Sequence, residues 1–111
     1  MKREFIELPG FHTDWESIGL TDRDLFHLED ELVENPKFGN VMRGTGGIRK
    51  LRFPLTNRGK SGSVRVIYVD LEIPEKIYFL TAYAKKEMEN LTEKQRSELK
   101  ALVQLLKKRS H

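Results

Sequence analysis

Three strand-like segments follow one another closely in the middle of the chain, and this run constrains the fold more than any other feature. They span residues 48–55, 63–71 and 76–83, and the second and third are rich in β-branched or aromatic residues. The links between them contain asparagine, glycine, serine and proline, which favour turns. Links this short join antiparallel neighbours, because a parallel pair needs a crossover of about a dozen residues or more. These segments therefore predict an antiparallel meander.

The N-terminal part predicts one further strand and a short helix. Residues 3–8 form a short apolar strand that ends at Pro9-Gly10. Thr13 followed by Glu16 matches an N-terminal capping box. We therefore expect a helix over residues 13–18.

Two longer helices are expected from their capping residues and apolar stripes. The first should begin at Thr21 and end before Asn35-Pro36, because the residue before a proline disfavours helical geometry. The second should begin at Thr92, which forms a capping box with Gln95. Both carry apolar residues at helical spacing, namely Leu25, Leu28, Leu32 and Val33 in the first and Leu99, Leu102, Val103 and Leu106 in the second.

The order strand, helix, helix, three strands, helix predicts an α+β fold, with a small antiparallel sheet, two N-terminal helices and a C-terminal helix. The length of 111 residues suits a single domain over residues 1–111. The chain has no cysteine, which excludes disulfides and zinc–thiolate sites and fits a reducing compartment. It has neither a run of about 18 apolar residues for a membrane span nor a signal-peptide core. We therefore expect a cytoplasmic protein that does not associate with membranes.

Charge is unevenly distributed along the chain. Residues 1–35 hold ten acids and three bases, whereas residues 41–65 hold seven bases and no acid, within a net charge of only +3. This uneven distribution gives the protein a directional electrostatic field, which suits a polyanionic partner. The alternative is a solvated basic loop.

Common catalytic motifs are missing. The three histidines, His12, His27 and His111, lie far apart and match no metal-binding spacing, so no metal site and no cofactor are expected. The glycines of Gly44-Thr45-Gly46-Gly47 lack the following lysine and hydroxyl residue of a phosphate-binding loop. Residues 39–47 are therefore interpreted as a loop that leads into a strand.

Basic residues at strand spacing form the strongest candidate site. Lys50 and Arg52 are two residues apart and share one face of a strand, and Arg65 in the next strand can approach them. Like charges facing one another cost about 0.2–1 kcal/mol per pair, so the arrangement favours a bound anion. Lys85 and Lys86 could extend the cluster. The alternative is an ordinary exposed face whose long side chains lie along the surface.

A cationic cluster suits one reaction of RNA. The 2′-hydroxyl can attack the neighbouring phosphate, so a protein has only to orient the groups and stabilise the charge on the phosphorane. Arginine offers a planar fork of donors for that charge, and a lysine could serve as general base. Tyr83 or Tyr68 could stack on a base.

Three blocks of sequence, in this order and spacing, resemble the RelE/HigB toxins of bacterial type II toxin–antitoxin systems. The blocks are Gly44–Phe53, Arg58–Tyr68 and Ala82–Thr92, within a resemblance that covers roughly residues 40–110. It implies the RelE-like fold and a ribosome-dependent endoribonuclease that cleaves messenger RNA and inhibits translation. Where some relatives place a tyrosine after the last strand, this chain reads Leu91-Thr92, and Tyr83 is the nearest substitute.

The resemblance also implies site residues. The catalytic basic positions carry over onto Lys50, Arg52 and Arg65. The expected contacts to RNA or the ribosome are Arg43, Arg49, Arg58, Lys60, Tyr83, Lys85 and Lys86.

The expected partners follow from the same resemblance. They are messenger RNA on the ribosome and a cognate antitoxin, in this subfamily often a helix-turn-helix protein that binds operator DNA itself. Two other functions remain open on such a fold. One is a ParE-like toxin that inhibits DNA gyrase, and the other is a non-catalytic nucleic-acid-binding module.

Overall fold

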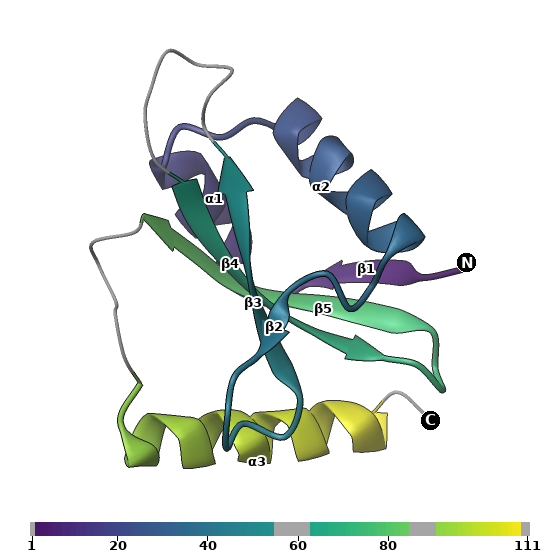
Figure 1. Cartoon of the computed structure of the whole chain (residues 1–111), viewed down its shortest axis with the longest axis vertical. Coiled ribbons are helices and arrows are strands. Elements are labelled where there is room, and N and C mark those ends of the chain that lie inside the picture. Colours follow the sequence, from purple (N-terminus) through teal and green to yellow (C-terminus); the bar gives the residue numbers. More distant parts are fainter. Residues whose placement is uncertain (1, 55–62, 85–90, 110–111) are drawn as a thin grey trace.

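The computed structural model describes residues 2–54, 63–84 and 91–109 of the chain (Figure 1). The secondary-structure elements are, in order, β1 (Glu4–Glu7), α1 (Phe11–Ser17), α2 (Asp22–Glu34), β2 (Asn40–Val41), β3 (Ile48–Pro54), β4 (Ser63–Leu71), β5 (Lys76–Ala84) and α3 (Glu93–Arg109). The predicted α+β class, with two N-terminal helices and one C-terminal helix, is confirmed.

The five strands form one sheet in the order β1-β5-β4-β3-β2. The predicted meander is confirmed, since β3 pairs antiparallel with β4, and β4 with β5. Two features differ from the prediction. The strand β1 adds to the edge in parallel, with Glu4 opposite Lys76, and the expected loop 39–47 contains the short strand β2, which pairs with β3.

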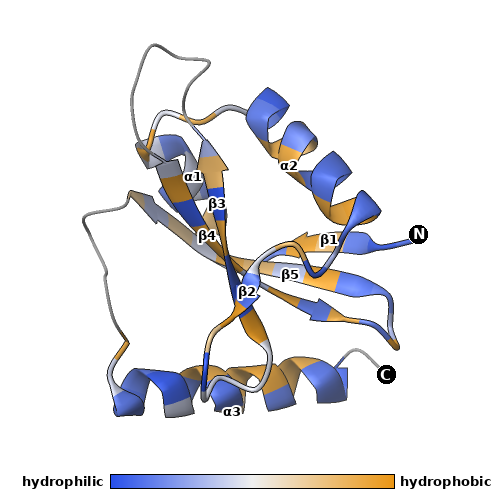
Figure 2. Cartoon of the chain, in the orientation of Figure 1, coloured by the Kyte–Doolittle hydropathy of each residue, from blue (hydrophilic) through white to orange (hydrophobic). Residues whose placement is uncertain are grey.

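Helices cover the two faces of the sheet separately (Figure 1). The residues of α1 and α2 pack on one face in a cluster that includes Trp15, Leu28, Val66 and Phe79. The residues of α3 pack on the other face, where Val103 joins a second cluster. Figure 2 shows the apolar stripes of α2 and α3 turned toward the sheet. The sheet therefore separates two small cores.

The start of α1 differs from the prediction. The helix begins at Phe11 rather than Thr13, and the residue before it, Gly10, has a φ of 92°. The prediction from the Thr13–Glu16 pair was wrong because aromatic packing decides the start: Phe11 is fully buried and its ring stacks with Trp15 and Phe79. A glycine tolerates this left-handed backbone without steric cost.

The two longer helices begin where the sequence predicts. The Thr21 hydroxyl accepts a hydrogen bond from the Asp24 backbone N–H, and the Asp24 carboxylate accepts one from the Thr21 N–H. Thr92 and Gln95 form the same reciprocal pair at the start of α3. Each box satisfies backbone donors that the first turn of a helix leaves unpaired.

Replacing Thr21 with alanine should lower the free energy of unfolding by roughly 1 kcal/mol, because the cap of α2 is lost. Urea denaturation followed by circular dichroism measures the change. Thr13→Ala is the matched control, since Thr13 lies inside α1 rather than at its N-cap. An equal loss in both variants would contradict this account of the cap.

Candidate active site

The central strands place the three predicted catalytic cations on one face of the sheet. Arg52 in β3 lies directly opposite Arg65 in β4, and Arg65 in turn lies opposite Tyr83 in β5. Lys50 is two residues from Arg52 along β3 and shares its face. The sequence spacing and the register of the meander thus bring these side chains together.

A pocket of about 360 Å³ opens at this place. Its lining combines the three cations with the segment before β3, and it consists of Phe38, Gly39, Asn40, Lys50, Leu51, Arg52 and Arg65. None of these residues is acidic, and none belongs to α3, which covers another part of the same face. The pocket therefore offers positive charge to a ligand that enters from solvent.

The two arginines differ in burial. The Arg52 side chain is exposed, whereas Arg65 is only 8% exposed. The Arg65 Nη1 atom donates a hydrogen bond to the Ser63 hydroxyl in the same strand. Within residues 2–54, 63–84 and 91–109, no carboxylate forms an ion pair with Lys50, Arg52 or Arg65. Arg65 is thus a buried cation that donates a hydrogen bond to a neutral hydroxyl.

Tyr83 lies beside Arg65 and is 7% exposed. Burial raises the pKa of the Tyr83 phenol, and the charge of Arg65 partly offsets this effect. The phenol therefore stays protonated at neutral pH and can donate a hydrogen bond near the pocket. Its ring packs within the cluster under α3, so it presents little surface for stacking on a base.

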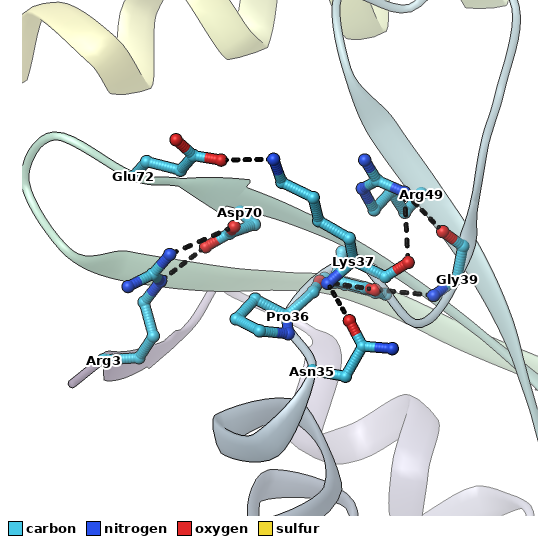
Figure 3. A network of polar contacts seen from close by, with 9 residues as sticks. Arg3, Asn35, Pro36, Lys37, Gly39, Arg49, Asp70 and Glu72 are labelled. Carbon is cyan, nitrogen blue, oxygen red and sulfur yellow. Dashed lines mark hydrogen bonds and ion pairs between the residues drawn. The ribbon is translucent and has the colours of Figure 1, made fainter. Parts of the chain in front are cut away.

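Arg49 lies on the opposite face from Lys50 and Arg52, where it faces Tyr68. Its Nη1 atom donates to the carbonyl oxygens of Gly39 and Lys37, at 2.7 and 3.3 Å (Figure 3). These bonds hold the segment before β2 against the sheet. The structure thus gives Arg49 a supporting contact behind the pocket.

Of the remaining predicted contacts, only Arg43 lies within the described residues. Arg43 is exposed in the loop between β2 and β3, and its carbonyl oxygen accepts a hydrogen bond from Arg96 of α3. Four others, Arg58, Lys60, Lys85 and Lys86, lie outside the described residues. They belong to the segments that follow β3 and β5, the strands that carry Arg52 and Tyr83.

Histidines and acids form no second site in the part of the chain that the structure describes. His12 lies 3.5 Å from Glu7 and 3.4 Å from Glu16 on the surface, and no three histidine, aspartate or glutamate side chains among the described residues could hold a metal ion together. No described helix is both long enough and apolar enough to cross a bilayer.

Sequence reasoning missed two features of the structure. Phe38 and Asn40 line the pocket, although they lie in a segment interpreted only as a connection. Arg3 and Asp70, which do not line this pocket, form a nearly buried ion pair with Nε and Oδ1 2.7 Å apart (Figure 3). For Phe38, the available sequence signal was an aromatic residue beside a glycine. The Arg3–Asp70 pair has no local sequence signal, because its residues are 67 positions apart.

Comparison with known proteins identifies the family and supports the fold. The family model described as "RelE toxin of RelE / RelB toxin-antitoxin system" matches residues 19–111. The fold resembles that of an E. coli RelE double arginine-to-alanine mutant in the free state, with a TM-score of 0.56 and 16% sequence identity over 78% of this chain and 86% of that chain. The family match includes every strand that carries the cationic cluster. The chain therefore belongs to the RelE toxin family and is the toxin of a toxin–antitoxin pair.

Proposed function

We propose that this toxin is a ribosome-dependent endoribonuclease that cleaves messenger RNA without a metal ion. The observation that supports it is the acid-free pocket in which Arg52 and Arg65 face each other directly, with Lys50 beside them. Two guanidinium groups and an ammonium group repel one another unless an anion lies between them. A phosphodiester is the anion that arginine forks bind best through paired hydrogen bonds.

The reaction proceeds by attack of the 2′-oxygen on the adjacent phosphorus. A new bond from phosphorus to the 2′-oxygen forms while the bond to the 5′-oxygen breaks, which leaves a 2′,3′-cyclic phosphate and a 5′-hydroxyl. The 2′-hydroxyl loses a proton and the leaving 5′-oxygen gains one. Arg65, fixed by burial and Ser63, stabilises the added charge on the phosphorane, and Arg52 and Lys50 position the phosphate.

The proposed surroundings follow from this substrate. A substrate on the ribosome implies a cytoplasmic protein, and Arg43, Arg58, Lys60, Lys85 and Lys86 would contact RNA or the ribosome. The cognate antitoxin, which we propose to be a helix-turn-helix protein that alone contacts operator DNA, would place acidic residues against the same cations.

Mapping of transcript 5′ ends after induced expression tests the proposed function. We expect new ends within translated reading frames, in phase with codons, and we expect adaptors to ligate to them only after kinase treatment because the ends carry 5′-hydroxyls. The same transcript with its start codon removed should stay intact. Supercoiling defects with intact messages would instead indicate a gyrase inhibitor, and salt-sensitive binding without new ends would indicate a non-catalytic module.

A further inference from the structure

Phe38 is an exposed aromatic residue at the pocket that holds the cations. Its exposed fraction is 52%, and among the described aromatic residues only Phe26, at 63%, is similarly exposed. Phe26 lies on α2, which packs on the other face of the sheet. Phe38 is therefore the aromatic ring available to a ligand of this pocket.

The backbone on both sides of Phe38 is anchored to the sheet. The Tyr68 hydroxyl donates to the Pro36 carbonyl oxygen and accepts from the Gly39 N–H, at 2.8 Å each. Arg49 binds the Gly39 carbonyl oxygen at 2.7 Å, and the Phe38 N–H donates to Asn35. The ring is thus presented from a fixed platform, which lowers the entropy lost when a ligand binds it.

Gly39 brings this platform against the strand that carries the cations. A Cβ atom added at Gly39 would lie 2.9 Å from the Lys50 carbonyl oxygen and 3.0 Å from the Tyr68 ring. Only glycine permits so close an approach. As a result, Phe38 and Asn40 line the pocket together with Lys50, Arg52 and Arg65, and Asn40 lies directly opposite Lys50.

A pocket lined by three cations and an exposed aromatic ring suits a nucleotide. Its volume of about 360 Å³ lies in the range of sites that hold small molecules. Bases of single-stranded RNA stack on aromatic side chains while backbone phosphates bind cations. The Asn40 amide also lines the pocket and adds a hydrogen-bond donor and an acceptor. The edge of a base can bond to both.

We propose that Phe38 stacks on the base of the nucleotide whose phosphate lies against Lys50, Arg52 and Arg65. This assignment rests on the proposed function, because it takes RNA as the substrate of the pocket. The sequence suggested that Tyr83 or Tyr68 stacks on a base, but both are buried. The assignment transfers this stacking role to Phe38.

Single-turnover cleavage on ribosomes programmed with a defined message tests the assignment. Phe38→Ala and Phe38→Leu should each lower the cleavage rate at subsaturating toxin by about 5- to 150-fold, because the π face is lost. Phe38→Tyr should retain the rate within a few-fold. Phe26→Ala is the matched control, since it removes an equally exposed ring elsewhere, and it should cleave like the wild type.

Fluorescence gives a readout that does not depend on cleavage. A 2′-O-methyl hexanucleotide with one 2-aminopurine cannot be cleaved, and its fluorescence falls when that base stacks on a ring. Quenching should occur with the wild type, Phe38→Tyr and Phe26→Ala, but not with Phe38→Leu. Equal quenching with Phe38→Leu would overturn the stacking assignment.

The outcomes separate this assignment from the proposed function. If the wild type cleaves and Phe38→Leu cleaves equally well, the stacking role is wrong and the nuclease stands. If the wild type does not cleave, the nuclease is wrong and the fluorescence result alone decides the role of Phe38. If Phe38→Ala cleaves normally but no longer binds the antitoxin, the ring is a protein anchor and the stacking assignment is overturned.

Discussion

Replacing Arg65 with alanine should abolish cell killing and lower the rate of mRNA cleavage by about 10²- to 10³-fold. Of the three cations at the pocket, Arg65 is the one that is buried, since it is 8% exposed and its guanidinium donates a hydrogen bond to Ser63. A rigid donor needs no reorganisation when charge develops on the phosphate. Growth after induction and cleavage on programmed ribosomes measure the two effects.

Two variants make this result specific. Arg65→Lys keeps the charge but loses the fork of donors, so it should recover only part of the activity. Arg23→Ala removes an exposed cation from α2, away from the pocket, and should remain as toxic as the wild type. Full toxicity of a folded Arg65→Ala protein would show that the catalytic site lies elsewhere.

Among the described ion pairs, the one between Arg3 and Asp70 should cost the most stability when one partner is removed, because it is the least exposed. Its side chains are 8% and 2% exposed, and a second bond joins Arg3 Nη2 to Asp70 Oδ2 at 3.3 Å. Asp70→Ala should lower the free energy of unfolding by roughly 3 kcal/mol, because it leaves a buried guanidinium without its partner. Chemical denaturation of the purified protein measures the loss.

A double-mutant cycle distinguishes a lost interaction from a general loss of packing. Adding Arg3→Ala to Asp70→Ala should restore part of the stability, since the unpaired charge is then removed as well. Glu72→Ala is the control, because the Lys37–Glu72 pair lies nearby with both side chains more than half exposed and should matter little. A loss in Glu72→Ala equal to that in Asp70→Ala would contradict the importance of burial.

The sequence predicted the site best where local rules determine geometry. Alternation along a strand and a short link suffice to predict that Arg65 approaches Lys50 and Arg52, because both act within about a dozen residues. The structure adds the register, in which Arg65 lies directly opposite Arg52. The capping boxes at Thr21 and Thr92 are equally local, and the structure confirms both.

Tertiary contacts account for the features that the sequence could not predict. The parallel pairing of β1 with β5 and the Arg3–Asp70 ion pair join distant residues, so no local pattern encodes them. The position of Phe38 is set by its neighbour Gly39, whose N–H donates to the Tyr68 hydroxyl and whose Cα packs closely against the Lys50 backbone. Both contacts depend on the finished sheet. Charge and spacing predicted an anion site, whereas its connection with RNA came from the family resemblance.

The parallel pairing of β1 with β5 also has a consequence for how the chain folds during translation. Translation produces Glu4–Glu7 before α1, α2 and the strands β2 to β4, and the partner strand Lys76–Ala84 emerges after all of them. Pairing between such distant segments is slow to form because a long loop must close. The nascent chain therefore cannot add β1 to its sheet until β5, which bears Tyr83 opposite Arg65, has left the ribosome.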